Sequence, residues 1–299
     1  MSLIVGIDAG GSSIECAIER NGLLSHASGA GANVRTIGAG EAGERVAAAL
    51  SGALRGDHPD AIVIGAAGAG DPELAAELRG ILERRFDRAR VAVYDDAAIA
   101  MRAAAPSGDG IVLIAGTGSI ACGFFGDAVY RAGGYGALAG DEGSGFAIGR
   151  AALALALRAF DGRAPQDPLA SAVASRFEAA NAPELIARVY AGGDPVATIA
   201  SLAPLVLECA GNGERSASKI VQTAAGDLVE LVKAVVKQAQ AASADVPLVF
   251  AGGMLANNSL LSYLIETRLT ADFPLFVPVK SAPAPVLGAL ALARRLAEA

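Results

Sequence analysis

Leu3-Ile-Val-Gly-Ile-Asp8-Ala-Gly10-Gly11-Ser12-Ser13-Ile14 and Ile111-Val-Leu-Ile-Ala-Gly116-Thr117-Gly118-Ser119-Ile120 are two stretches of this chain that share one pattern. In each, an apolar strand runs into a Gly/Ser/Thr turn and leaves it as a second apolar strand. Such a turn leaves backbone N–H groups and hydroxyls free to bind phosphate oxygens. Two copies predict two similar halves that bind one nucleotide.

The composition is that of a soluble α/β protein with two domains. The chain has 299 residues, 53% of them hydrophobic, with 37 glycines and no tryptophan, which is enough for two substantial cores. The net charge of −7 and the pI near 5.0 argue against nucleic-acid and anionic-membrane partners, which require clustered Lys and Arg. The uncharged residues 110–126 are interrupted by glycines, which favours a buried hairpin over a membrane span.

Cysteines and histidines are few and widely spaced. Cys16, Cys122 and Cys209 form no CxxC pair, which argues against a disulfide framework or a structural zinc site and fits a reducing cytoplasm. We expect Cys16 and Cys122 to be small core residues in corresponding hairpin strands. His26 and His58 are expected at the surface or in turns.

The first half of the chain reads as a series of strands followed by alternating helices and strands. The predicted elements are strands at 3–7, 13–19, 23–28, 61–64 and 91–94, and helices at 42–54, 72–86 and 97–104. Asp71 is a candidate N-cap, with Pro72 at the first helical position. The segment Ala105-Pro-Ser-Gly-Asp-Gly110 breaks the pattern and predicts a domain boundary.

The second half repeats this order and adds a helical insertion. The predicted elements are strands at 111–115, 120–125, 128–132, 247–251 and 275–279, and helices up to about 160, over most of 165–243, and at about 257–270 and 285–298. We expect the last helix to pack on the first domain. The predicted domains are residues 1–106 with 285–299, and residues 107–284. This repeated order resembles the actin/hexokinase/Hsp70 superfamily, which implies an α/β fold of two RNase H-like domains with a nucleotide cleft between the halves.

Asp8 directly precedes the first turn, which contains Gly10, Gly11, Ser12 and Ser13. An aspartate at a strand end is often only a turn former. A carboxylate beside a phosphate-binding turn is also placed to hold Mg²⁺ through water. The second, similar turn favours the phosphate interpretation.

The second turn has a rival interpretation, because Gly116-x-Gly118-x-x-Ala121 matches a dinucleotide-binding fingerprint. That fingerprint must open a helix, whereas the residues after Ala121 are broken by glycines and lead to another strand. We therefore favour a phosphate turn made by Gly118 and Ser119. The chain has no Gly-x-x-x-x-Gly-Lys-Ser/Thr motif, which argues against a P-loop ATPase.

The doublet Asp95-Asp96 stands where a strand gives way to a helix. One carboxylate can cap the helix while the other serves as a base. Phosphoryl transfer to an alcohol needs one base for the hydroxyl proton, with metal and backbone donors for the phosphates. Asp96 is the candidate catalytic residue.

The segment Gly133-Gly-Tyr-Gly-Ala-Leu-Ala-Gly-Asp-Glu-Gly-Ser-Gly145 is the most specific string in the chain. It can be a flexible loop before an acidic helix start, but its glycine density favours close approach to a ligand. With Gly-Thr-Gly-Ser before it, Asp-Asp-Ala upstream and Ala-Gly-Gly downstream, the whole chain resembles the BadF/BadG/BcrA/BcrD-type ATPase family in its N-acetylglucosamine kinase branch.

The resemblance implies ATP-dependent phosphorylation of an amino sugar, N-acetylglucosamine or glucosamine, at its 6-hydroxyl, with Mg²⁺ and in a chain that can form a homodimer. It also implies roles for single residues. The implied roles are catalytic base for Asp96, sugar contacts for Asn33, Asp96, Thr117, Gly134 and Asp141, phosphate contacts for Gly10, Gly11, Ser12, Ser13, Gly118 and Ser119, and adenosine contacts for Gly252 and Gly253.

The sequence departs from the family pattern at several positions. Ser12-Ser13-Ile14 stands where the family often has a threonine and a lysine, and Asp95 replaces the usual asparagine. Two adjacent carboxylates raise one pKa of the pair. Ala132, Tyr135 and Arg35 replace a cysteine and two tryptophans of the animal enzymes, so the expected acetyl pocket differs.

Other functions remain open at this stage. The dehydratase-activating branch of the same family couples ATP hydrolysis to an iron-sulfur cluster and needs a cysteine set that Cys122 alone does not supply. A non-catalytic sugar sensor is a third class, but the chain shows no N-terminal helix-turn-helix pattern. Another acceptor sugar, such as N-acetylmuramic acid, is also open, because pocket shape decides the sugar.

Overall fold

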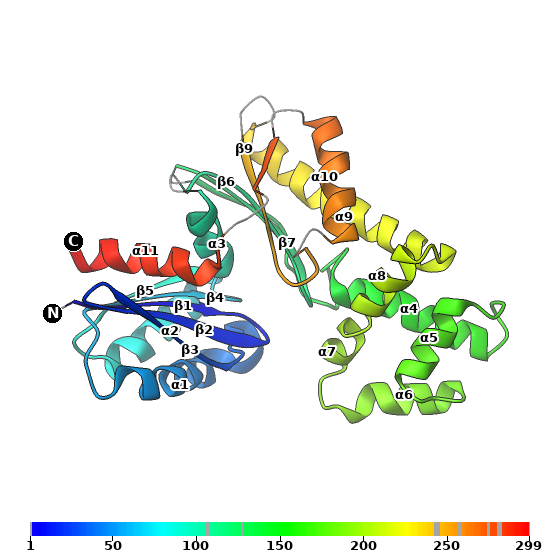
Figure 1. Cartoon of the computed structure of the whole chain (residues 1–299), viewed down its shortest axis with the longest axis horizontal. Helices are drawn as coiled ribbons and strands as arrows, with labels where there is room; N and C mark the ends of the chain where they lie inside the picture. The colour runs from blue at the N-terminus through cyan, green and yellow to red at the C-terminus, as the bar shows by residue number, and fades with distance from the viewer. Residues whose placement is uncertain are drawn as a thin grey trace. The chain divides into compact units, whose positions relative to one another are not determined.

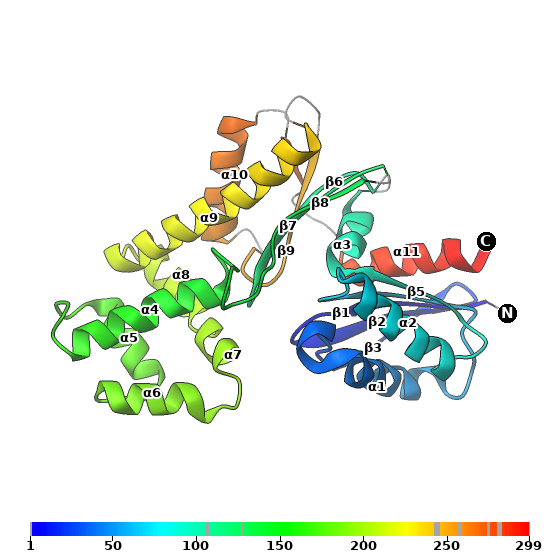
Figure 2. The same ribbon diagram turned by 180° about the vertical axis from the view of Figure 1, so that it is seen from behind.

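The computed structural model describes residues 2–105, 108–126, 128–241, 246–255, 259–273, 276–279 and 283–298. The chain divides into two units (Figure 1; Figure 2 shows the reverse side). Unit 1 is Met1–Gly110 with Ser281–Ala299, and unit 2 is Ile111–Lys280. Each unit contains a five-stranded sheet with helices, so the duplicated α/β architecture is confirmed. Residues 106–107 and 281–282 of the predicted domain joints, and part of the predicted helix start near 257, lie outside the described residues.

Unit 1 is built on a mixed sheet in the order β3-β2-β1-β4-β5. The strands are β1 (Leu3–Ala9), β2 (Ser13–Arg20), β3 (Leu23–Ala30), β4 (Ala61–Ala66) and β5 (Arg90–Asp95). β1 is antiparallel to β2 and parallel to β4, and β4 is parallel to β5. The carboxyl ends of β1, β4 and β5 therefore lie at one edge of the sheet.

Helices cover both faces of this sheet (Figure 1). They are α1 (Val34–Leu54) and α2 (Pro72–Arg85) on one face, and α3 (Asp96–Ala104) and α11 (Pro285–Glu298) on the other. The backbone of α11 approaches β1 closely, because a β-carbon at Gly6 would lie 2.3 Å from the backbone nitrogen of Leu290. The expectation that the last helix packs on the first domain is confirmed. Asp71 caps α2, as predicted.

The predicted start of the first helix, at residue 42, is wrong. The helix begins at Val34, and Asn33 caps it by accepting a hydrogen bond from the Arg35 N–H at 3.0 Å. Gly38, with φ 80° and ψ 158°, interrupts the helical backbone, so residues 34–37 form a separate first turn. A contact distant in sequence secures this turn, since the Val34 N–H donates to the carbonyl of Ala67 at 2.9 Å.

Unit 2 has the sheet order β10-β9-β6-β7-β8. Its strands are β6 (Gly110–Ala115), β7 (Ser119–Phe125), β8 (Ala128–Gly133), β9 (Val246–Ala251) and β10 (Phe276–Val279). β9 is parallel to β6 and to β10, and β7 is antiparallel to β8. In both units the first strand lies between a hairpin on one side and parallel strands on the other: β1 lies between β2 and β4, and β6 lies between β7 and β9.

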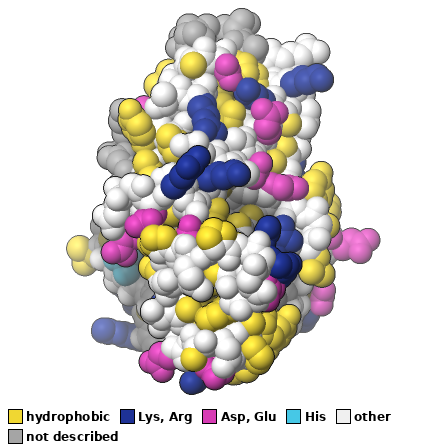
Figure 3. All heavy atoms as spheres, turned by 90° about the vertical axis from the view of Figure 1, so that its right-hand side faces the viewer, with side chains coloured by type: hydrophobic (Ala, Val, Ile, Leu, Met, Phe, Trp, Pro, Cys, Tyr) yellow, Lys and Arg dark blue, Asp and Glu magenta, His cyan; other side chains and the backbone are white. Residues whose placement is uncertain are grey.

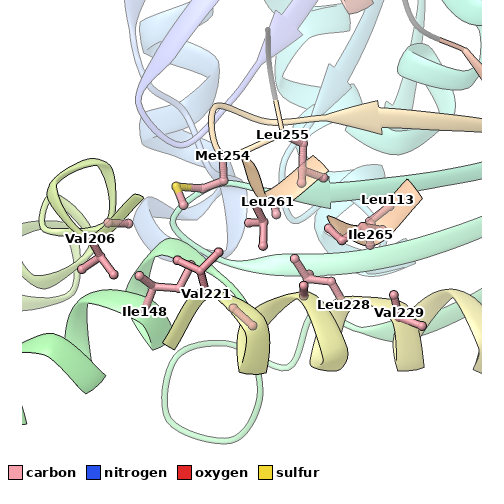
Figure 4. Close-up of a cluster of buried hydrophobic side chains, with 14 of the residues drawn as sticks. Leu113, Ile148, Val206, Val221, Leu228, Val229, Met254, Leu255, Leu261 and Ile265 are labelled. Atoms are coloured by element: carbon pink, nitrogen blue, oxygen red, sulfur yellow. The ribbon is translucent and has the colours of Figure 1, made fainter. Parts of the chain in front are cut away.

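The helices of unit 2 pack around one apolar core. They are α4 (Gly145–Phe160), α5 (Pro168–Arg176), α6 (Ala182–Ala191), α7 (Pro195–Ala200), α8 (Ala203–Gly211), α9 (Arg215–Ala239) and α10 (Leu260–Asp272). Figure 4 shows side chains from the sheet and from α4, α8, α9 and α10 lying together, and Leu113, Ile148, Val206, Leu228 and Ile265 are all buried.

Within the described ranges, no single helix is both long and apolar enough to cross a membrane. One bent pair, Ala182–Ala191 with Pro195–Gly211 at 119°, passes that test on length and composition alone. Its side chains Leu185 and Val206 are fully buried in the core of unit 2.

The cysteines and histidines lie where the sequence predicts. Cys16 in β2 and Cys122 in β7 are buried in corresponding hairpin strands. His26 and His58 are exposed.

Candidate functional site

The carboxyl edge of the unit 1 sheet brings the predicted acidic residues together. Asp8 in β1 pairs with Gly65 in β4, and the next strand, β5, pairs its Asp95 with Ala66. Asp8 and the Asp95-Asp96 doublet therefore flank the end of β4. The electrostatic interaction between Asp8 and Asp96 is strong enough to raise the pKa of Asp96.

The first turn is closed by one backbone hydrogen bond, from the Gly10 N–H to the Ser13 carbonyl at 3.0 Å. Among the described residues, no group accepts from the N–H of Gly11 or of Ser12. These two amides and the exposed Ser12 hydroxyl are able to donate hydrogen bonds to an anion, which is what a phosphate-binding turn requires.

Gly31 supports this turn, and the sequence reasoning did not assign it a role. A β-carbon at Gly31 would lie 2.1 Å from the carbonyl oxygen of Gly11. The Ala32 N–H also donates to the Gly10 carbonyl at 2.8 Å. The glycines at the end of β3 were the available signal, but only the pairing of the two segments shows which one is essential.

Asp8 is half-buried, and its pKa is raised to about 6. Burial is the larger cause, and the negative charge of Glu15 adds to it. A bound cation would oppose both effects by favouring the charged carboxylate. Hard carboxylate oxygens are the donors that Mg²⁺ prefers, and it commonly binds one or two carboxylates together with substrate phosphates. Asp8 therefore fits the role of a carboxylate beside a magnesium–phosphate complex.

One carboxylate of the Asp95-Asp96 doublet caps α3, as the sequence predicts. Asp95 is the N-cap, and one of its carboxylate oxygens accepts from the Ala97 N–H at 2.9 Å. Asp96 accepts from the same N–H at 2.9 Å. The pKa of Asp96 lies well above its usual value, because the carboxyl is buried and because Asp95 and Asp8 add negative charge.

Asn33 reaches the same region of unit 1 through the loop after β4. The Ala67 N–H donates to the Ala9 carbonyl at 3.0 Å, while the Ala67 carbonyl accepts from Val34. Gly68, with φ 88°, leaves room for this arrangement, since a β-carbon there would lie 3.0 Å from Asn33 Oδ1. Gly68 is a second supporting glycine that the sequence reasoning did not assign.

The second turn, in unit 2, is also closed by a backbone hydrogen bond, but this bond joins residues two apart where that of the first turn joins residues three apart. Gly116 N–H donates to the Gly118 carbonyl at 2.9 Å, which closes the turn. No described group accepts from the N–H of Thr117 or of Gly118. The turn leads into strand β7, not into a helix, so the dinucleotide-fingerprint interpretation is wrong for this motif.

Asp141 lies directly against this turn. Its carboxylate is so close to Gly118 that a β-carbon at 118 would lie 2.7 Å from Asp141 Oδ2. Asp141 is buried and has a left-handed backbone, with φ 58°. A proposed sugar residue and a proposed phosphate residue are thus neighbours within unit 2.

Ser119 and Gly134 are held mainly by the protein itself. Ser119 is buried, and its hydroxyl donates to the Glu142 carbonyl at 2.7 Å. The Ser119 carbonyl accepts from the Gly134 N–H at 2.9 Å, and Gly134 has φ 73°. These bonds fasten the glycine-rich segment to the second turn.

The N-terminus of α4 is occupied by protein acceptors. Gly145 N–H donates to the Gly116 carbonyl at 2.8 Å and Phe146 N–H donates to the Thr117 carbonyl at 3.2 Å. Ser144 Oγ accepts from the Ala147 N–H at 3.2 Å. Because these amides are used, the free anion-binding groups of this region are in the turn and not at the helix end.

Gly252 and Gly253 follow β9 at the same sheet edge as the second turn. Gly252 has φ 86°, and a β-carbon there would lie 2.4 Å from the Ala115 carbonyl oxygen. That carbonyl accepts from the Met254 N–H at 3.0 Å. Gly253 is exposed, and no described residue lies within 4 Å of its β-carbon position, so of this pair only Gly252 is required by the described part of the fold.

Each unit thus assembles its own share of the predicted site residues. Unit 1 brings together Asp8, Gly10, Gly11, Ser12, Ser13, Asn33 and Asp96, and unit 2 brings together Thr117, Gly118, Ser119, Gly134, Asp141, Gly252 and Gly253. In the part of the chain that the structure describes, no group of three His, Cys, Asp or Glu side chains is arranged to hold a metal. On the face in Figure 3, basic and acidic side chains are interspersed.

The chain matches a sequence model described as the BadF/BadG/BcrA/BcrD ATPase family over residues 5–293. It is 31% identical over 235 residues to an N-acetylmuramic acid/N-acetylglucosamine kinase of Clostridium acetobutylicum, covering 78% of this chain and 77% of the relative. It is 32% identical over 190 residues to an N-acetyl-D-glucosamine kinase of Dictyostelium discoideum, covering 62% of this chain and 59% of the relative.

Solved structures share the fold. A candidate N-acetylglucosamine kinase from Chromobacterium violaceum superposes with a TM-score of 0.78 at 24% identity, covering 98% of this chain and 99% of that one. A ROK family glucokinase from Streptomyces griseus, solved with glucose and AMPPNP, superposes with a TM-score of 0.59 at 19% identity, covering 98% and 100%. At these identities the likeness concerns the two-domain α/β fold.

Proposed function

The chain belongs to the BadF/BadG/BcrA/BcrD ATPase family, and we propose that it is an ATP-dependent kinase that phosphorylates an amino sugar at its 6-hydroxyl. The observation that carries this proposal is Asp96, a buried carboxyl of raised pKa at the sheet edge that also presents the first phosphate turn. The named functions of the Clostridium and Dictyostelium relatives support it.

Asp96 is the proposed general base. Its carboxylate accepts the proton of the sugar 6-hydroxyl while that oxygen forms a bond to the γ-phosphorus of ATP. The bond between the γ-phosphorus and the β,γ-bridging oxygen breaks, and ADP leaves with that electron pair. A raised pKa makes the Asp96 carboxylate a stronger base than that of an exposed aspartate and suits this task.

The two turns are the proposed phosphate sites. In unit 1 the free amides of Gly11 and Ser12, and in unit 2 those of Thr117 and Gly118, can donate to phosphate oxygens. Gly252 and Gly253, at the same edge as the second turn, are the proposed adenosine contacts.

We propose that Mg²⁺ binds together with ATP and that Asp8 holds the ion through a water molecule. When bound, Mg²⁺ neutralises charge on the β- and γ-phosphates. The carboxyl of Asp8 fits this role by its position next to the first turn and by its raised pKa, which a neighbouring cation would lower.

The remaining parts of the proposal concern the sugar and the setting of the reaction. Asn33, Thr117, Gly134 and Asp141 are the proposed sugar contacts beside Asp96. The cytoplasm is the proposed compartment, supported by the free cysteines Cys16 and Cys209. We propose that the protein forms a homodimer, and light scattering, which measures the molar mass in solution, tests this.

A coupled assay of ADP release over a panel of sugars tests the proposed function. We expect turnover with N-acetylated or free amino sugars that greatly exceeds ADP release without sugar. The site of phosphorylation is read by NMR of the product, which should carry phosphate on oxygen 6. ATP hydrolysis at the same rate with and without every sugar would contradict the proposal.

A further inference from the structure

Arg35 stands beside a proposed sugar contact, and none of the described residues pairs with its charge. It lies in the first turn of α1, two residues after the N-cap Asn33, and its backbone N–H is the donor that Asn33 Oδ1 accepts. The side chain is exposed. Within the described residues, its guanidinium makes neither an ion pair nor a hydrogen bond.

The turn that carries Arg35 is fastened to the edge where the chemistry is proposed. Val34 N–H donates to the Ala67 carbonyl at 2.9 Å, in the loop that directly follows β4. A β-carbon at Gly68 of this loop would lie 2.9 Å from Arg35 N and 3.0 Å from Arg35 Cβ. The arginine side chain therefore starts from a fixed point on the same sheet edge as Asp8 and Asp96.

Arg45, on the same helix, shows how a structural arginine behaves in this unit. Its guanidinium binds Glu41 at 2.9 Å and the Gly31 carbonyl at 2.6 Å, so it holds the helix against the first turn. Arg35 has no such contacts. The difference argues that the charge of Arg35 does not serve the fold.

Acidic residues lie at the sheet edge to which the Arg35 turn is fastened. Asp8, Asp95 and Asp96 lie at the carboxyl ends of β1 and β5, and Asp71 caps the helix that follows the Gly68 loop. An acidic edge repels an anionic sugar, and a neutral sugar needs no cation. A guanidinium at this edge is useful to a substrate that itself carries an anionic group.

On the basis of the proposed function, we infer that Arg35 is a specificity residue that binds a carboxylate carried by the amino-sugar substrate. The guanidinium donates two parallel N–H bonds to the two carboxylate oxygens, which is the geometry a planar fork favours. An amino sugar with a carboxylate on an ether arm has the required chemistry, and N-acetylmuramic acid is such a sugar.

Steady-state kinetics on the full-length protein test the inference with two sugars, N-acetylmuramic acid and N-acetylglucosamine. For Arg35→Gln, the ratio of kcat/KM for the acidic sugar to that for the neutral sugar should fall by about ten- to a hundredfold, as expected for a charge-assisted pair. Arg35→Lys should lose less, because it keeps the charge but not the fork. Arg88→Gln is the matched control: it removes an exposed arginine of the same unit and should leave the ratio unchanged.

A second experiment uses a substrate analogue whose ether arm is neutral. The amide of N-acetylmuramic acid keeps the size of the arm and removes its charge. The wild-type protein should discriminate against this amide relative to the acid, and Arg35→Gln should not. Added salt should reduce kcat/KM for the acid more than for N-acetylglucosamine.

The outcomes separate this inference from the proposed function. If N-acetylglucosamine is phosphorylated but Arg35→Gln changes both sugars equally, the role of Arg35 is overturned and the kinase proposal stands. The same holds if the wild-type protein accepts the acid no better than its amide. If no amino sugar is phosphorylated by any variant, both proposals are overturned.

Discussion

The carboxylate of Asp141 occupies the space that a side chain at Gly118 would need. A β-carbon at 118 would lie 2.7 Å from Asp141 Oδ2 and 3.0 Å from its carboxyl carbon. Gly118 is therefore required by a neighbouring side chain of unit 2, in addition to any requirement that a phosphate imposes. The two proposed sites of this unit, for phosphate and for sugar, are mechanically linked.

Gly118→Ala should weaken sugar binding as well as ATP binding. The added methyl must displace Asp141, and overpacking of this kind costs about 1–3 kcal/mol. Isothermal calorimetry with the sugar and with a non-hydrolysable ATP analogue measures both affinities. Gly116→Ala is the control in the same turn, because a β-carbon there has no neighbour within 4 Å. Unchanged sugar affinity in a folded Gly118→Ala protein would show that Asp141 does not contact the sugar.

Asp96→Asn should reduce kcat by about 10² to 10⁴ while ATP and sugar still bind, because the amide cannot accept the hydroxyl proton. Steady-state kinetics measures kcat, and calorimetry on the same preparation measures the binding of ATP and sugar. Asp95→Asn is the paired variant at the neighbouring carboxylate. If Asp95→Asn loses this activity and Asp96→Asn keeps it, the base has been assigned to the wrong member of the doublet.

Asp95→Asn should move the acidic limb of the kcat/KM profile to lower pH. Asparagine caps a helix as well as aspartate does, so α3 keeps its cap at Ala97. The substitution removes the negative charge of residue 95, which raises the pKa of Asp96 in the wild-type protein. Asp8 remains as the other charged neighbour that raises this pKa. A limb that stays in place would show that Asp96 is not the titrating base.

Asp8→Asn should stabilise the free protein at pH 7.5. The pKa of Asp8 is raised from 3.8 to about 6, so the folded state binds this proton more tightly than the unfolded state. The resulting contribution is complete below pH 3.8 and is lost as the pH rises through about 6. Removal of the charge should therefore raise the free energy of unfolding at pH 7.5 by on the order of 1–3 kcal/mol, and much less at pH 4.

Urea denaturation at the two pH values measures this difference, and the exposed Glu77→Gln serves as the control for a lost negative charge. The same Asp8→Asn variant should bind ATP more weakly when Mg²⁺ is present. An equal change at both pH values would mean that Asp8 is not the origin of the linkage.

Gly252→Ala should lower thermal stability, whereas Gly253→Ala should weaken ATP binding and leave stability unchanged. Gly252→Ala forces a left-handed alanine into the Ala115 carbonyl and should lower the melting temperature. Gly253→Ala adds a methyl into open space, so it should leave stability unchanged and weaken ATP binding through contact with the nucleotide. Thermal melts with and without ATP distinguish the two. A Gly253→Ala protein with normal ATP affinity would remove Gly253 from the nucleotide site.

The sequence by itself determined the order of the elements and the motifs at their ends. Short apolar runs that end in glycine-rich turns, such as Leu3–Ile7 and Ile111–Ala115, indicate buried strands. Pro72 after Asp71 marks a helix start through local backbone chemistry. The doublet Asp95-Asp96 also marks a helix start, because the cap is a contact between Asp95 and Ala97, two residues apart in the chain. These features depend on neighbours in the chain, which a sequence displays directly.

Tertiary structure decided which residues meet across the fold. The early start of α1 depends on a bond from Val34 to Ala67, and the need for glycine at 31 depends on the Gly11 carbonyl. The contact between Asp141 and Gly118 and the raised pKa of Asp8 likewise arise from segments that the sheet brings together. The physical reason is that steric exclusion, desolvation and charge act over a few ångströms in space, and separation along the chain does not reveal that distance.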